Sequence, residues 1–417
     1  MQLKSILNRV ERYKPFVYGK VQWVEKAPRP TIEVQIVPRA KSRPICSSCG
    51  RKGPGYDRLP PRRFEFVPLW QIAVFFVYAM RRVDCPRCGV TVEQVPWGEG
   101  KCTLTTSFRW FLARWAKRLS WQEVADAFWV SWEDVFRSVK HAVSWGLAHR
   151  DLSGIEAIGV DEIQWHRGHH YLTLVYQIDE GMKRLLWIAQ DRTEQSLRGF
   201  FQILSEEIRL AIRFVCSDMC RAYMNVIAEQ LSTAVHVLDR FHIMKKMNEA
   251  IDEVRREEAR RLKQDGYEPV LTNSRWCLLK RPENLTDKQT VKLAELLRYN
   301  LKSVRSYLLR EDFQRFWEYT SAGWAGKFLD QWCTRTLRTR IEPMKKVVGT
   351  LCEHRDLILN WFRARGSISA GAVEGLNNKA KLTTRKAYGF RTYEGIETAL
   401  YHTLGELPEP KFTHEFC

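Results

Sequence analysis

Short apolar runs with a period of two residues fill the first hundred positions, which is typical of β-strands. The longest covers residues 72–79. Residues 104–150 change to a helical period, and Ser120 and Ser131 each precede an acid by three residues, the pattern of a capping box. The pattern therefore predicts a strand-rich N-terminal segment followed by three short helices.

The next segment, residues 155–242, alternates strand-like and helix-like patterns in the order βββαβαβ. The predicted strands cover 158–163, 171–178, 184–190, 214–218 and 234–239, and the predicted helices cover 197–208 and 221–231. Residues 243–366 are helical in pattern almost throughout, and 367–405 return to a helix after a serine-rich turn. This order predicts a multidomain α/β protein.

Charge divides the chain in the same places. Lysines and arginines number 67 and aspartates and glutamates 48, a formal charge of +19. The net charge is +14 in residues 1–150, −4 in 151–242, +9 in 243–366 and zero in 367–417. Basic blocks of this size favour nucleic-acid binding, although a solvated basic surface is the plainer alternative.

The longest apolar stretch, residues 67–80, is too short to cross a bilayer, and the first 18 residues contain no apolar segment of the signal-peptide type. We therefore expect a cytoplasmic protein without a membrane partner.

Two Cys-x-x-Cys-Gly sequences, Cys46 to Gly50 and Cys85 to Gly89, predict a structural zinc site. Four thiolates suit the tetrahedral coordination of Zn²⁺, and each two-residue spacer lets one turn present two sulfurs. The 35 residues between the pairs exceed the usual spacing, which fits a zinc ribbon with long strands. A redox pair or incidental core cysteines are the alternatives.

The two capping boxes suggest a helix-turn-helix, whose second helix would carry Arg137, Lys140 and His141 toward DNA. Two features oppose this interpretation. The turn has no glycine, and Glu133 and Asp134 at the start of the second helix would repel phosphate. A plain helical bundle is the alternative.

Carboxylates interrupt buried strand patterns in the acidic segment, at Asp161 and at Asp218. A buried carboxylate is costly unless a cation meets it, and Mg²⁺ prefers such oxygen ligands. Glu162 competes with Asp161 for this role, but neighbours on a strand point to opposite faces, so only one can join the site.

These residues carry a resemblance. Asp161, Asp218 and the sequence Asp239-Arg-Phe-His242 resemble the RNase H-like core of DDE transposases. Residues 371–391 resemble their glutamate helix. With the cysteine pairs in front, the chain is most similar to the ISL-three family of bacterial insertion sequences.

The resemblance implies a metal-binding catalytic triad of Asp161, Asp218 and Glu374, which would hold two Mg²⁺ or Mn²⁺ ions. Asp239, His242 and Asn378 would support it. These six residues make up the implied active site.

In a helix, Glu374, Asn378, Lys381 and Arg385 would form one polar stripe, and the two cations could hold DNA phosphates. Ser367 or Ser369 could cap the start of this helix.

The implied domains are a zinc finger (1–103), a helix-turn-helix (104–150), an RNase H-like mixed sheet in two parts (151–242 and 367–417), and an all-α insertion (243–366) between those parts. In the insertion, tryptophans lie among basic residues and could stack on unpaired bases, although most are expected in the core.

We expect a transposase that binds double-stranded DNA at terminal inverted repeats and in the target, and catalyses metal-dependent cleavage and strand transfer. A homodimer or larger assembly is expected on DNA, because two ends must meet. The alternatives are a DNA-binding regulator or domesticated transposase without catalysis, and an RNase H-like structure-specific nuclease.

Overall fold

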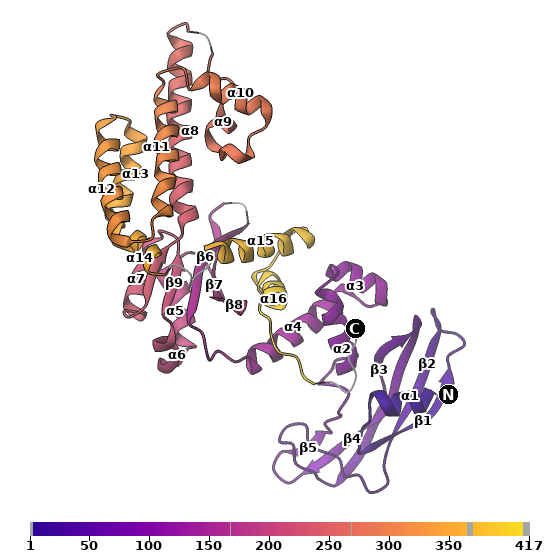
Figure 1. Ribbon diagram of the computed structural model, residues 1–417. Helices are drawn as coiled ribbons and strands as arrows, with labels where there is room; N and C mark the ends of the chain where they lie inside the picture. Colours follow the sequence, from indigo (N-terminus) through magenta and orange to yellow (C-terminus); the bar gives the residue numbers. More distant parts are fainter. Residues whose placement is uncertain (1–2, 167, 268, 365–369, 412–417) are drawn as a thin grey trace. The chain divides into compact units, whose positions relative to one another are not determined.

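The computed structural model describes residues 3–166, 168–267, 269–364 and 370–411. The chain divides into two compact units, one formed by Met1–Asp151 with Leu382–Cys417 and the other by Leu152–Lys381 (Figure 1). Ser367 and Ser369, the predicted caps of the glutamate helix, lie outside the described residues.

The first unit combines a sheet with a group of helices. Its elements are α1 (Leu3–Val10), β1 (Phe16–Trp23), β2 (Thr31–Pro38), β3 (Gly55–Leu69), β4 (Ile72–Cys85), β5 (Gly89–Val92), α2 (Thr106–Ala116), α3 (Trp121–Phe128), α4 (Trp132–His149) and α16 (Tyr393–Leu404).

The sheet of this unit has the strand order β1-β2-β4-β3, and β5 pairs with the C-terminal end of β4. Strand β4 covers the predicted run 72–79 and buries Val74, Phe76 and Tyr78, so the strand expected there is confirmed. The indole of Trp97 packs edge-on against Tyr78 and is itself almost fully buried. Aromatic packing of this kind forms the core on that face of the sheet.

Both predicted capping boxes are present. The hydroxyls of Ser120 and Ser131 accept hydrogen bonds from the backbone amides of Glu123 and Asp134, and those two carboxylates bond back to the serine amides. In the turn between α3 and α4, Trp129 takes the left-handed position that glycine commonly occupies, with φ of 59°.

The second unit is built on a five-stranded sheet. Its elements around the sheet are β6 (Ala157–His166), β7 (His170–Asp179), β8 (Met182–Gln190), α5 (Glu194–Gln202), α6 (Glu206–Ala211), β9 (Phe214–Ser217), α7 (Arg221–Gln230), β10 (Val235–Leu238) and α15 (Ala370–Lys386), of which the last turn belongs to the first unit.

The strand order is β10-β9-β6-β7-β8, with β6, β9 and β10 parallel and the β6–β7–β8 meander antiparallel. The predicted succession of five strands along the chain is confirmed. The single helix predicted over 197–208 is wrong, because Ser205 accepts a hydrogen bond from the amide of Ile208 and begins a separate helix, α6.

The described residues of the segment 243–364 are largely helical, as predicted. It contains α8 (Arg240–Gln264), α9 (Arg275–Leu279), the 3₁₀-helix η1 (Pro282–Asn284), α10 (Asp287–Leu296), α11 (Lys302–Gln314), the 3₁₀-helix η2 (Arg315–Glu318), α12 (Ala322–Arg338), α13 (Glu342–Glu353) and α14 (Arg355–Arg363).

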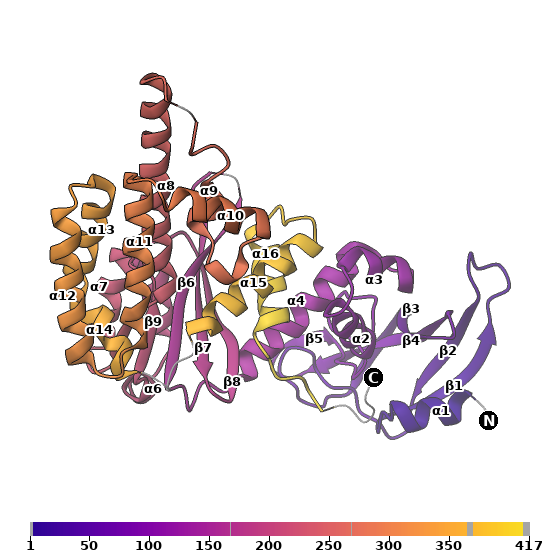
Figure 2. The same ribbon diagram turned by 45° about the horizontal axis from the view of Figure 1, so that its top comes forward.

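In both views α8 lies beside α11 and α12 beside α13 (Figures 1 and 2). Trp317 and Trp332 are buried in the core of this bundle, as expected for most of its tryptophans, whereas Trp276 and Trp324 are exposed. Within the described residues, no helix has the length and apolar character needed to cross a membrane.

Candidate active site and metal centre

Three carboxylates lie at the same edge of the second sheet. In the parallel ladders Ser217 pairs with both Val160 and Leu238, so Asp161, Asp218 and Asp239 follow at the same level on or just after three neighbouring strands. Adjacent strands are about 4.8 Å apart, which brings the three residues together. Each has less than a tenth of its surface exposed.

Asp161 and Glu162 point to opposite faces, as strand alternation requires. Asp161 lies on the face that meets α15, where its Oδ2 accepts a hydrogen bond of 2.5 Å from the side chain of Asn377. Glu162 lies on the face covered by α5 and α7, where its Oε2 is 2.8 Å from Nε of Arg192.

Arg192, which precedes α5, lies between the carboxylates of Glu162 and Asp218. Its guanidinium donates a hydrogen bond of 2.8 Å to Asp218 Oδ2 as well as pairing with Glu162. Burial, with the charge of Asp218 close by, nevertheless raises the pKa of Glu162 to about 7, and burial raises the pKa of Asp218. Burial thus disfavours the charged form of both carboxylates, although Arg192 pairs with each of them.

The start of α8 closes the site on the side of β10. Asp239 is the N-cap of this helix and accepts a hydrogen bond of 2.8 Å from the amide of Phe241. His242 lies in the first turn, with Nε2 3.8 Å from Asp161 Oδ1. Burial lowers the pKa of His242, but Asp161 and Asp239 outweigh it and the net pKa is raised.

Helix α15 brings the glutamate segment to this edge. Glu374, Asn378, Lys381 and Arg385 all lie on its exposed side, as the predicted polar stripe requires. Glu374 is near enough to Asp239 for its charge to contribute to the raised pKa of that residue, which burial chiefly causes.

The opposite side of α15 packs on β6. Asn377, not its neighbour Asn378, faces the sheet, where it donates to Asp161 and accepts a hydrogen bond of 2.8 Å from the hydroxyl of Tyr176. The close approach depends on Gly159, since a Cβ there would lie 2.4 Å from Cγ2 of Val373. Sequence reasoning identified neither Asn377 nor Arg192 as part of the site.

A second cluster lies in the first unit. The sulfurs of Cys46, Cys49, Cys85 and Cys88 all lie within 4.8 Å of one another. The Cys49–Cys85 separation of 3.6 Å is too long for a disulfide and close to the edge, about 3.8 Å, of a tetrahedron with Zn–S bonds of about 2.3 Å.

The glycines after the two knuckles, Gly50 and Gly89, both have φ of 71°, which explains the glycine in each Cys-x-x-Cys-Gly sequence. Across the described part of the chain, no other group of three or more histidine, cysteine or acidic side chains is gathered as tightly as the four thiols. The cluster is able to hold a metal ion.

Comparison with known proteins decides the family. The sequence profile of a transposase family of the ISL-three type matches residues 158–400, more than half of the chain. The chain belongs to the ISL-three family of transposases.

The transposase is 30% identical over 394 residues to the transposase for insertion sequence element IS1001 of Bordetella parapertussis, with 94% of this chain and 96% of that protein covered. It is 29% identical over 389 residues to the transposase for insertion sequence element IS1557 of Mycobacterium tuberculosis strains CDC 1551 / Oshkosh and H37Rv, with 87% and 86% covered.

On helix α4 of the transposase, the three residues predicted to contact DNA lie in different surroundings. Arg137 is exposed and pairs with Glu133 at 3.0 Å, and Lys140 is exposed and pairs with Glu394. His141 is half-buried against the indole of Trp110, and burial lowers its pKa. Arg137 and Lys140 are therefore better placed than His141 to meet a phosphate.

Proposed function

We propose that this transposase cleaves and joins DNA by a DDE mechanism, with Asp161, Asp218 and Glu374 as the metal-binding triad. The second unit would then be an RNase H-like core interrupted by the helical insertion. The observation that carries the proposal is that Asp161 on β6 lies level with Asp218, which directly follows the neighbouring parallel strand β9, beside the helix that bears Glu374.

The donor set fits Mg²⁺ or Mn²⁺. Hard divalent ions take carboxylate oxygens, and the strand edge has an excess of buried carboxylates over cations. When bound, two such ions would activate the attacking oxygen and stabilise the leaving one.

The chain's own residues set the geometry of the site. Asn377 donates a hydrogen bond to Asp161, and His242 lies beside the same carboxylate, where it would add positive charge when protonated. Arg192 orients Asp218, whose other oxygen accepts a hydrogen bond of 2.9 Å from the amide of Cys220.

We further propose that the first unit recognises the terminal inverted repeats. A zinc ion on Cys46, Cys49, Cys85 and Cys88 would hold the segment before β3 against the turn between β4 and β5. Arg137 and Lys140 of a helix-turn-helix would contact the DNA backbone. Lys381 and Arg385, on the exposed stripe of α15, would hold phosphates near the cut. A dimer or larger assembly on DNA would follow from pairing two ends.

The test is cleavage of element-end DNA in Mg²⁺ by the full chain and by Asp218→Asn, which keeps the size of the side chain but removes its charge. We expect a loss of at least about 100-fold in cleavage with little change in end binding, because the ligand charge acts on the reaction rather than on DNA affinity. Glu207→Gln, an exposed acid-to-amide change on α6, is the matched control.

Cleavage by Asp218→Asn at the wild-type rate would refute the triad. End binding by the wild type without cleavage in either Mg²⁺ or Mn²⁺ would favour the alternative of a DNA-binding regulator.

A further inference from the structure

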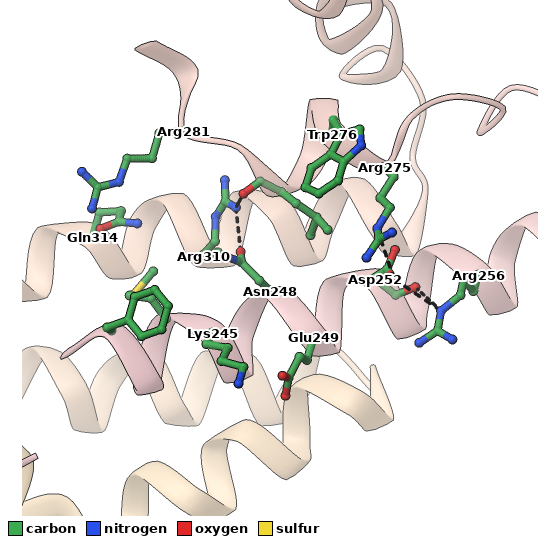
Figure 3. Close-up of a pocket in the computed structure, with 13 residues that line it drawn as sticks. Lys245, Asn248, Glu249, Asp252, Arg256, Arg275, Trp276, Arg281, Arg310 and Gln314 are labelled. Carbon is green, nitrogen blue, oxygen red and sulfur yellow. Dashed lines mark hydrogen bonds and ion pairs between the residues drawn. The ribbon is translucent and has the colours of Figure 1, made fainter. Parts of the chain in front are cut away.

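A cavity of about 430 Å³ lies in the helical insertion between α8, α9 and α11 (Figure 3). Its size is within the range of about 300–1,000 Å³ typical of small-ligand sites. Phe241, Met244 and Leu279 supply apolar lining. No carboxylate of the sheet edge lines this cavity, although Phe241, which does, follows two residues after the N-cap Asp239 on α8.

One end of the cavity is cationic. Figure 3 shows Arg281 and Gln314 on one side of Arg310, with Lys245 below them. Among the described residues, the side chains of Lys245 and Arg281 have neither a hydrogen bond nor an ion pair. Arg240 lies close to Arg281, and burial together with that second charge lowers its pKa. Lys245 and Arg281, which form no ion pair with the acidic residues of the lining, favour an anion at this end.

The other end is aromatic. Trp276 is 51% exposed, in contrast to the buried Trp317 and Trp332 of the same insertion. The guanidinium of Arg275 lies 5.0 Å from the centre of its ring, and Arg275 is in turn 3.7 Å from Asp252. A large exposed ring beside a cation is a surface on which a base can stack.

Hydrogen bonds of Arg310 cross-link the wall between the two ends. Arg310 is 3% exposed and donates hydrogen bonds to Asn248 Oδ1 at 2.9 Å and to the carbonyl of Leu279 at 3.0 Å. These bonds connect α11 with α8 and α9. The three helices that line the cavity are thereby joined through Arg310.

We propose that this cavity binds one unpaired nucleotide of a DNA strand, with the base against Trp276 and the phosphate at Lys245 and Arg281. The proposal rests on the DNA-cleaving function proposed above. A base within a duplex is already stacked on its neighbours, so only an unpaired one can enter. Glu249, one turn from Lys245 on α8, can accept a hydrogen bond from a base amino group.

The test measures binding of the full-length protein, without divalent metal, to a DNA duplex carrying one bulged nucleotide and to the same duplex fully paired. We expect the wild type to prefer the bulged duplex. Trp276→Ala should weaken binding of the bulged duplex by about five- to 150-fold, the factor that stacking one base on an aromatic ring supplies, and leave the paired duplex unchanged.

The matched control is Trp324→Ala. Trp324 is also exposed, at 62%, and carries a cation over its ring, Lys327 at 4.5 Å, but it lies on α12 outside the cavity. Its removal should leave the preference for the bulged duplex intact. Removing Lys245 or Arg281 should reduce the salt dependence of binding to the bulged duplex.

Equal affinity of the wild type for both duplexes would overturn the proposal, and so would equal affinities of the Trp276→Ala and Trp324→Ala variants for the bulged duplex. Cleavage of paired end DNA by the wild type in Mg²⁺ is measured in parallel. If the wild type cleaves this DNA but does not prefer the bulged duplex, the cavity proposal fails while the proposed function stands. Trp276→Phe keeps a ring and should retain most of the preference, which separates lost stacking from misfolding.

Discussion

The two neighbouring asparagines of α15 should differ sharply when each is replaced by alanine. Asn377 is 6% exposed and connects Asp161 with Tyr176, whereas Asn378 is exposed on the other side of the helix. Asn377→Ala removes both hydrogen bonds and leaves two buried polar groups, the Asp161 carboxylate and the Tyr176 hydroxyl, without those partners.

An unsatisfied buried polar group costs about 1–3 kcal/mol. The Asp161 carboxylate keeps a hydrogen bond of 2.7 Å from the amide of Glu162, so its share is at the lower end. We therefore expect Asn377→Ala to reduce the free energy of opening α15 from the sheet by roughly 2–4 kcal/mol. Asn378→Ala should change it by less than about 0.5 kcal/mol, since nothing buried depends on it.

Amide hydrogen exchange of the full chain measures the free energy of opening α15 locally, without requiring the two units to unfold together. Peptides from α15 and β6 should exchange roughly 30- to 1,000-fold faster in Asn377→Ala than in the wild type. Tyr176→Phe should have a smaller effect, because Asn377 still donates to Asp161. Similar protection of α15 in the Asn377→Ala and Asn378→Ala variants would refute the assigned hydrogen-bond chain.

Three further predictions follow from other parts of the structure. Gly159→Ala should displace α15 and reduce the cleavage rate by roughly tenfold or more. Adding Val373→Ala should restore much of the cleavage rate in the same assay, because the double variant removes the clashing methyl group. Purified protein should contain about one zinc ion per chain by elemental analysis, and Cys49→Ser should lower both this content and the melting temperature of the first unit. Burial lowers the pKa of His402 to about 3, so below pH 6.5 only the unfolded chain takes up its proton. His402 should therefore make the free energy of unfolding of the first unit about 2 kcal/mol lower at pH 5 than at pH 8, as measured by urea denaturation. His402→Leu should remove this difference. An unchanged pH dependence in that variant would contradict the assignment.

Local patterns predicted the helix starts and the cysteine turns, because each depends on residues only a few positions apart. The hydroxyls of Ser120 and Ser131 cap helices where the spacing to an acid predicts it. The succession of strands along the chain also followed, since short turns connect β6, β7 and β8 and helices lie between the parallel strands. The break between α5 and α6 was missed, because an apolar face that continues through a capping serine looks like one helix.

By itself the sequence determined the succession of strands in the second unit, the two cysteine knuckles and the carboxylates on or just after its parallel strands. Only the tertiary structure decided which neighbour of a pair faces inward. Consecutive residues on a helix differ by about 100° in direction, so the choice between Asn377 and Asn378 required the packing of α15 on Gly159. The pairing of Arg192 with Asp218 and the cavity beside Trp276 likewise join residues distant in sequence, through contacts that no local pattern encodes.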